Sequence, residues 1–217
     1  MNRRRTTPGT LVLFVAIVIG FVLEVVNGAW TNPRILSEMG AIVPAYVHEG
    51  QYWRLLSAMF LHGDGTVRGT LLHLVMNLFA LFQLGSLYEV MFGTRRFVWI
   101  YFLTGIAASA ASFMRLPLFG SSVGASGAIF GVMGAFVFSV WRSPRWRHDP
   151  VARSIVKQCV FWMIANIVIG LNIPQIDNAA HIGGLVAGML LGALLPHPAP
   201  PPAPPAQVVI DVAPRDD

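Results

Sequence analysis

The chain has 217 residues, of which 55% are hydrophobic and only 12% charged, and its mean hydropathy is +0.62. Soluble domains carry about a quarter charged residues, so this composition excludes an ordinary soluble domain. The net charge of +5 comes from fourteen Arg and one Lys that fall between apolar runs. A nucleic-acid-binding protein needs a basic face or stripe instead, and no nucleic acid partner is expected.

Six apolar stretches approach or reach the roughly 20 residues that cross a bilayer. They predict an all-α, polytopic membrane protein with six transmembrane helices packed in one bundle. The stretches lie at residues 10–29, 70–91, 97–114, 123–141, 155–171 and 179–195. The first could be a signal peptide, because residues 1–5 are basic. Its apolar run is longer than a usual signal core and no small-x-small cleavage site follows, so a retained span is expected.

The segments around the spans divide the chain further. Residues 1–9 form a basic N-terminus, residues 10–195 the membrane domain, and residues 196–217 a Pro-rich tail that is expected to be disordered. Residues 30–69, between the first two spans, are rich in Trp, Tyr and Met as well as polar residues. Such a mixture suits a structured segment that rests in the membrane interface.

The basic residues predict the orientation. With the N-terminus in the cytoplasm, eleven of the fifteen Arg and Lys residues lie on the cytoplasmic side, and the outer side keeps Arg34, Arg54, Arg68 and Arg115. Cytoplasmic loops carry an excess of Lys and Arg, so both termini are expected inside. No organelle-targeting segment is evident, which favours a bacterial-type cytoplasmic membrane. The lone Cys159 permits no intrachain disulfide.

Four polar residues inside the spans are candidates for chemistry, because such groups are costly in a membrane. His73 and Asn77 fall in the first two turns of the second stretch, Ser126 in the first turn of the fourth, and His181 in the first turn of the sixth. These three stretches all run from outside to inside in the expected orientation. A helix rises 1.5 Å per residue, so all four residues are expected in the outer part of the bilayer.

The chemistry of these residues fits together. A serine hydroxyl becomes a nucleophile when a base within hydrogen-bond reach removes its proton, and histidine titrates in the right range. Ser126 lies in Gly124-Ala125-Ser126-Gly127, where small residues permit close approach. Near a helix N-terminus, free backbone N–H groups can stabilise an oxyanion. His73 and Asn77, spaced i, i+4, share a helix face and can donate to the same oxyanion.

Glycines support the same pairing of helices. Gly184, Gly188 and Gly192 recur every four residues after His181, and Gly127, Gly131 and Gly134 follow Ser126. Such faces let two helix backbones approach closely. Phe130, one turn after Ser126, is then placed to pack under the imidazole of His181.

Each feature taken alone has a plainer interpretation. A Gly-Ala-Ser-Gly run in a membrane helix is more often a packing surface, and a histidine at a helix mouth is more often an interfacial group. An asparagine one turn away more often makes a hydrogen bond between helices. Glu89 is expected to anchor helix ends, and Asp177 to cap the last span rather than act on His181. The remaining histidines receive no catalytic role: His48, His62, His148 and His197. The first two of these can shape the outer loop.

Taken together, these residues resemble the rhomboid family. The resemblance covers most of the chain from about residue 50 to 192 and rests on Trp53-Arg54, His73-x-x-x-Asn77, Gly85-x-x-x-Glu89, Gly124-Ala125-Ser126-Gly127 and Ala180-His181-x-x-Gly184-x-x-x-Gly188. It implies a six-span bundle that hydrolyses membrane-anchored proteins with a Ser126–His181 dyad. It also implies an oxyanion hole of His73, Asn77 and the Ser126 backbone N–H, a mobile cap at residues 172–178, and lateral entry of substrates from lipid.

Other classes are weighed against this hypothesis. A metal-dependent intramembrane protease needs H-E-x-x-H, which is absent, and an aspartyl protease needs paired Asp residues within spans. A transporter would distribute polar groups along a path across the membrane. A noncatalytic scaffold would tolerate loss of the Ser126 hydroxyl. The expected partners are single-span membrane proteins and the lipid bilayer, and no metal or organic cofactor is implied.

Overall fold

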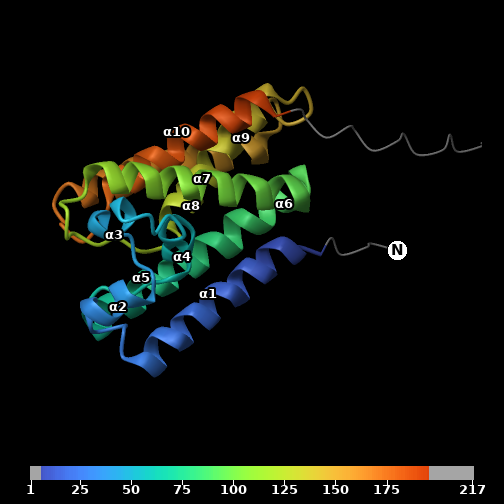
Figure 1. Cartoon of the computed structure of the whole chain (residues 1–217). Helices are drawn as coiled ribbons and strands as arrows, with labels where there is room; N and C mark the ends of the chain where they lie inside the picture. Colours follow the sequence, from blue (N-terminus) through green and yellow to red (C-terminus); the bar gives the residue numbers. More distant parts are fainter. Residues whose placement is uncertain (1–5, 196–217) are drawn as a thin grey trace, which may run out of the picture.

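The computed structural model describes residues 6–195, which fold as a bundle of helices (Figure 1). Within these residues the β-type pairing is limited to an isolated antiparallel bridge between Ile42 and Ser122. The all-helical class predicted from the sequence is therefore confirmed. The basic residues 1–5 and the Pro-rich tail at 196–217 lie outside the described residues.

Four helical segments are long and apolar enough to cross a membrane. They are α1 (Pro8–Asn27), the continuous segment formed by α5 (Val67–Ala80), the π-helix η2 (Leu81–Gly85) and α6 (Ser86–Phe92), then α7 (Thr94–Arg115) and α9 (Pro150–Gly170). The chain is therefore a multi-pass membrane protein.

Two further apolar helices, α8 (Ser126–Arg142) and α10 (Asn178–Leu194), have 17 residues each. At 1.5 Å per residue they extend about 26 Å, slightly less than the roughly 30 Å of bilayer hydrocarbon. Both coincide with the fourth and sixth apolar stretches of the sequence. They are the most closely packed pair of helices, and both also pack against α7 (Figure 1).

Glycine makes the α8–α10 contact possible. A Cβ on Gly184 would collide with the backbone oxygen of Gly127, and one on Gly188 with the backbone oxygen of Gly131. The two backbones touch along this seam, as small residues permit in membrane helices. The seam fixes the position of α10, and therefore of His181, relative to the start of α8.

Short helices occupy the segment between α1 and α5: α2 (Pro33–Met39), α3 (Pro44–His48), α4 (Arg54–Ser57) and the 3-10 helix η1 (Ala58–Phe60). The buried guanidinium of Arg54 holds them together by donating to the carbonyls of Ser37 at 2.5 Å and Ala41 at 2.9 Å. The structured segment expected from its composition is thus present.

At the opposite end of the bundle, Glu89 fixes the start of α1. Its carboxylate accepts hydrogen bonds from the backbone of Gly9 at 2.9 Å and Thr10 at 2.8 Å, and from the hydroxyls of Thr10 and Thr94. A carboxylate suits the positive end of the helix dipole. The anchoring role predicted for Glu89 is confirmed.

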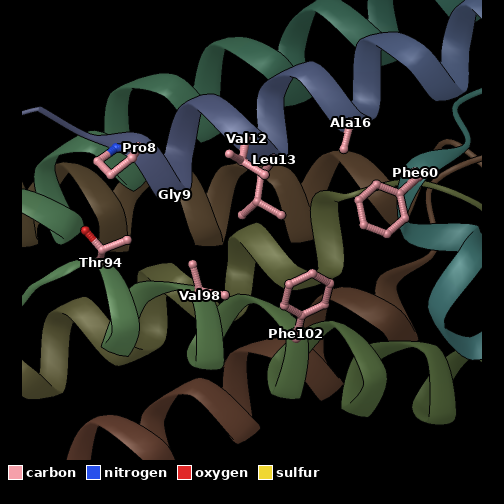
Figure 2. A pocket seen from close by; sticks show the side chains of 9 residues that line it. All are labelled: Pro8, Gly9, Val12, Leu13, Ala16, Phe60, Thr94, Val98 and Phe102. Atoms are coloured by element: carbon pink, nitrogen blue, oxygen red, sulfur yellow. The ribbon is translucent and has the colours of Figure 1, made fainter.

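A hollow of about 320 Å³ separates α1 from α7, with Phe60 closing one end (Figure 2). Its walls are almost wholly apolar, and the hydroxyl of Thr94 is already bonded to Glu89. This hollow offers no nucleophile or base. A second, much larger cavity lies elsewhere in the bundle and holds the polar residues singled out from the sequence.

Candidate active site

The segment before α8 positions Ser126 at the first residue of the helix. Gly124 has a φ of 125°, a conformation that favours glycine, and its N–H donates to the Ala58 carbonyl at 2.8 Å. The bridge between Ile42 and Ser122 fastens the same segment a few residues earlier. Ser126 therefore projects from the mouth of α8, where the first backbone N–H groups lack intrahelical acceptors.

His181 lies within hydrogen-bond distance of Ser126, with 2.9 Å between its Nε2 atom and the serine Oγ. The imidazole is 5% exposed and stacks on Phe130, with ring centroids 4.2 Å apart and planes within 2°. Stacking and burial restrict the ring to one orientation. The residues that the sequence places on two separate helices, including Phe130 beneath the ring, thus lie together in the structure.

The hydrogen bond defines what His181 can do. A serine that donates to Nε2 requires the neutral tautomer with its proton on Nδ1. That Nδ1 atom is buried and has no hydrogen-bond partner among residues 6–195. Asp177, the nearest carboxylate along the chain, accepts from the Ala180 N–H at 3.0 Å and from the Ser112 hydroxyl. Asp177 therefore caps α10, as predicted, rather than bonding the imidazole.

His73 and Asn77 project from α5 into the same cavity as Ser126 and His181. The Nδ1 atom of His73 lies 3.2 Å from the His62 carbonyl, and its Nε2 atom faces Gly124, where a Cβ would come within 2.7 Å of it. Asn77 donates one amide hydrogen to the His73 carbonyl at 2.8 Å. The second amide hydrogen of Asn77 remains free for a ligand.

The cavity has a volume of about 1740 Å³. It begins at Ser126 and His181 and continues between the α5–η2 segment and α9, where Gln83 and Gln158 line its walls. Space of this size can admit water and an extended peptide to the serine. In the described part of the chain, no three His, Cys, Asp or Glu side chains gather as a metal site would require.

His62 is a residue whose importance the sequence reasoning underestimated. It is fully buried, and its ring centroid lies 5.0 Å from that of His73. Its backbone N–H donates to Glu24 at 2.5 Å, its carbonyl faces His73, and its Nε2 atom lies 3.5 Å from the Ala125 N–H. His62 thus connects α1 with both His73 and the segment that carries Ser126.

Acidification is expected to destabilise the protein through His62. Burial lowers the pKa of its imidazole well below the ordinary value of 6.5. The unfolded chain therefore binds a proton that the folded protein does not, so this stability is present above pH 6.5 and is lost as the pH falls below it. The thermal midpoint of the parent in detergent, taken relative to that of a His62→Asn variant, should drop between about pH 7.5 and about pH 5.

The variant His62→Asn should show a smaller drop than the parent over this pH range. The exposed His48 provides a matched control, since His48→Asn should keep the parental drop. Equal pH dependence in parent and His62→Asn would show that His62 is not the group responsible.

Comparison with known proteins identifies the family of the chain. The family model of the Rhomboid domain matches residues 49–198. The Rhomboid protease GluP of Bacillus subtilis is 36% identical over 180 residues, which cover 82% of this chain and 33% of that protein. RHOMBOID-like protein 6, mitochondrial, of Arabidopsis thaliana is 37% identical over 152 residues, covering 70% and 46%.

Rhomboid-like protease 2 of Toxoplasma gondii is 27% identical over 189 residues, covering 83% of this chain and 62% of that protein. The chain thus spans between a third and somewhat under two thirds of the length of these relatives. The matched region contains every residue discussed above from Trp53 to His181. The chain belongs to the rhomboid family.

Proposed function

We propose that this chain is an intramembrane serine endopeptidase that cleaves membrane-anchored proteins, with Ser126 as nucleophile and His181 as general base. The observation that carries the proposal is the contact of 2.9 Å between Ser126 Oγ and His181 Nε2, at the mouth of α8 and inside a large cavity. Family membership supports it, since two of the relatives compared above are described as proteases.

The proposed reaction is acyl transfer. His181 takes the hydroxyl proton as Ser126 Oγ attacks the scissile carbonyl, and then gives that proton to the leaving amine as the C–N bond breaks. Water then attacks the ester carbonyl and loses a proton to His181. His181 passes this proton to Ser126 Oγ as the ester C–O bond breaks, which releases the new carboxyl terminus and restores the serine. Phe130 keeps the imidazole in place through both steps.

The oxyanion would be held by the backbone N–H of Ser126, the free amide hydrogen of Asn77, and His73. Preorganised donors of this kind stabilise the charge that develops on the carbonyl oxygen. Whether His73 can donate to the oxyanion depends on the protonation state of its ring. If its Nδ1–H donates to the His62 carbonyl, its Nε2 can donate only when the ring is protonated. Asn77 needs no such change.

In the membrane, we place residues 10–195 as a domain of six spans, counting the shorter α8 and α10 with the four longer segments. Residues 1–9 and 196–217 are assigned to the cytoplasm. Among the described residues, seven basic side chains lie at the α1-start end, namely Arg95, Arg96, Arg142, Arg145, Arg147, Arg153 and Lys157, against four at the Ser126 end. This asymmetry supports a site near the outer face of a cytoplasmic membrane.

The test is covalent labelling by a serine-directed fluorophosphonate. The purified protein in detergent is expected to acquire one phosphonyl group on Ser126, located by mass spectrometry, because an activated serine is the group that such reagents attack. His181→Ala should slow the labelling strongly. Labelling of other serines at the same rate as Ser126, or equal labelling in the His181→Ala protein, would contradict an activated nucleophile and favour a transporter or scaffold.

A further inference from the structure

Two glutamines face the large cavity from opposite walls, far from Ser126. Gln83 belongs to η2 and Gln158 to α9, and both line the cavity that contains Ser126 and His181. Both side chains are exposed, and neither carboxamide hydrogen-bonds to another residue in the range 6–195. They are polar groups without partners within segments long and apolar enough to cross the membrane.

The two glutamines lie at one level of the bundle. Gln83 precedes the end of α6 at Phe92 by nine residues, and Gln158 follows the start of α9 at Pro150 by eight residues. A rise of 1.5 Å per residue places them about 14 Å and about 12 Å from the same end. Leu87 and Ile155, one turn nearer that end, also line the cavity. The cavity therefore reaches this depth on both sides.

The local structure of η2 adds a second observation. Gln83 is the central residue of the π-helix Leu81–Gly85, which interrupts an otherwise α-helical segment. Short π segments inside α-helices are frequently associated with functional sites. The wall opposite is loosely attached, because α9 buries only 17% of its most apolar stretch, against 33% to 44% in the other three long segments. The two walls can accept a further helix between them.

The family resemblance already implies that a substrate span enters laterally from lipid, and for a span in this gap we propose that Gln83 and Gln158 hydrogen-bond to a polar side chain in its inner half. The inference rests on the proposed protease function and specifies its substrate class. Acyl chains offer no hydrogen-bond partner to an amide, whereas an Asn, Gln, Ser or Thr on a helix does. A helix in the gap also continues directly toward Ser126, because the cavity is continuous.

The experiment uses matched single-span substrates in lipid nanodiscs. One carries only Leu in the inner turn of its span, and four others carry Asn at successive positions of that turn, so that one faces the glutamines. At the best position Asn should raise kcat/KM by about three- to thirtyfold over Leu, the effect of one or two interhelical hydrogen bonds. The Gln83→Leu/Gln158→Leu protein should reduce this ratio to about one.

A control keeps the comparison specific. Asn27, an exposed amide on α1 outside the cavity, bonds the Leu23 carbonyl at 2.8 Å, and Asn27→Leu should preserve the parental ratio. Because the ratio is taken within each protein, partial loss of folding in a variant does not affect it. The inference is overturned if the parent shows no preference at any position, or if the preference survives replacement of both glutamines.

Binding separates this inference from the protease proposal. Energy transfer between labelled substrate and the Ser126→Ala protein reports association without catalysis. Tighter binding of the Asn substrate to Ser126→Ala, lost in the additional Gln83→Leu/Gln158→Leu background, supports the inference even if the parent cleaves nothing. Absence of cleavage with that preference intact would overturn the protease alone, and equal binding of all substrates would overturn the role of the glutamines alone.

Discussion

Replacing Ser126 with Ala is expected to lower the kcat for cleavage of a single-span substrate by about 10⁴- to 10⁶-fold, and His181→Ala by a comparable factor. The first variant removes the nucleophile, and the second removes the only base within hydrogen-bond distance of its hydroxyl in the described structure. The double variant should be no worse than either single variant, because the two side chains act as one unit.

The measurement is product formation by purified protein in detergent, with circular dichroism to show that the helices remain. Matched controls are Ser154→Ala and His148→Ala, which change the same residue types at exposed positions at the other end of the bundle. Both should cleave as the parent does. Cleavage that survives in Ser126→Ala and His181→Ala would remove the serine mechanism, whatever the family of the chain.

Much of this arrangement could be predicted from the sequence because two strong signals apply to membrane helices. The length of the apolar runs in the sequence locates the membrane helices, so that α1, α7 and α9 begin and end within a few residues of the expected stretches. The cost of burying polar groups in lipid then singles out residues such as Ser126 and His181. Their common depth follows from helix geometry, and the structure places their side chains 2.9 Å apart.

The features that the sequence did not predict depend on contacts between distant segments. The short helices between residues 30 and 69 are set by bonds such as those from Arg54 to the Ser37 and Ala41 carbonyls, which leave no periodic pattern. The π-helix Leu81–Gly85 continues an apolar run, and its one polar residue, Gln83, does not distinguish a π-helix from an α-helix. His62 lies outside the spans, so a search for polar residues inside them passes over it, although the fold buries it completely.

Glu24 shows a signal that was present and not used. It is a carboxyl group inside the first apolar stretch, the same observation that drew attention to Glu89 in the second. The structure buries it fully and gives it the backbone N–H of His62 as a partner. The rule that intramembrane ionisable residues have a purpose therefore extends to α1, where the purpose is to hold the loop that supports His73.

Replacing Asn77 with Ala is expected to lower kcat by about 10²- to 10³-fold with little change in KM, the usual cost of removing one oxyanion-hole donor. Asn77 is buried, lines the cavity with Ser126, and uses only one of its amide hydrogens, for the His73 carbonyl. The other hydrogen is needed only when negative charge develops on the substrate, so the loss should appear in the chemical step rather than in binding.

Asn27→Ala is the matched control, since Asn27 makes the same bond to the carbonyl four residues earlier but lies outside the cavity. It should leave kcat unchanged, which excludes a general effect of losing that local bond. An Asn77→Ala protein with parental kcat would assign the oxyanion to the Ser126 backbone N–H and His73. Because the Nδ1 of His73 contacts the His62 carbonyl, His73 would then have to be protonated in order to donate from Nε2.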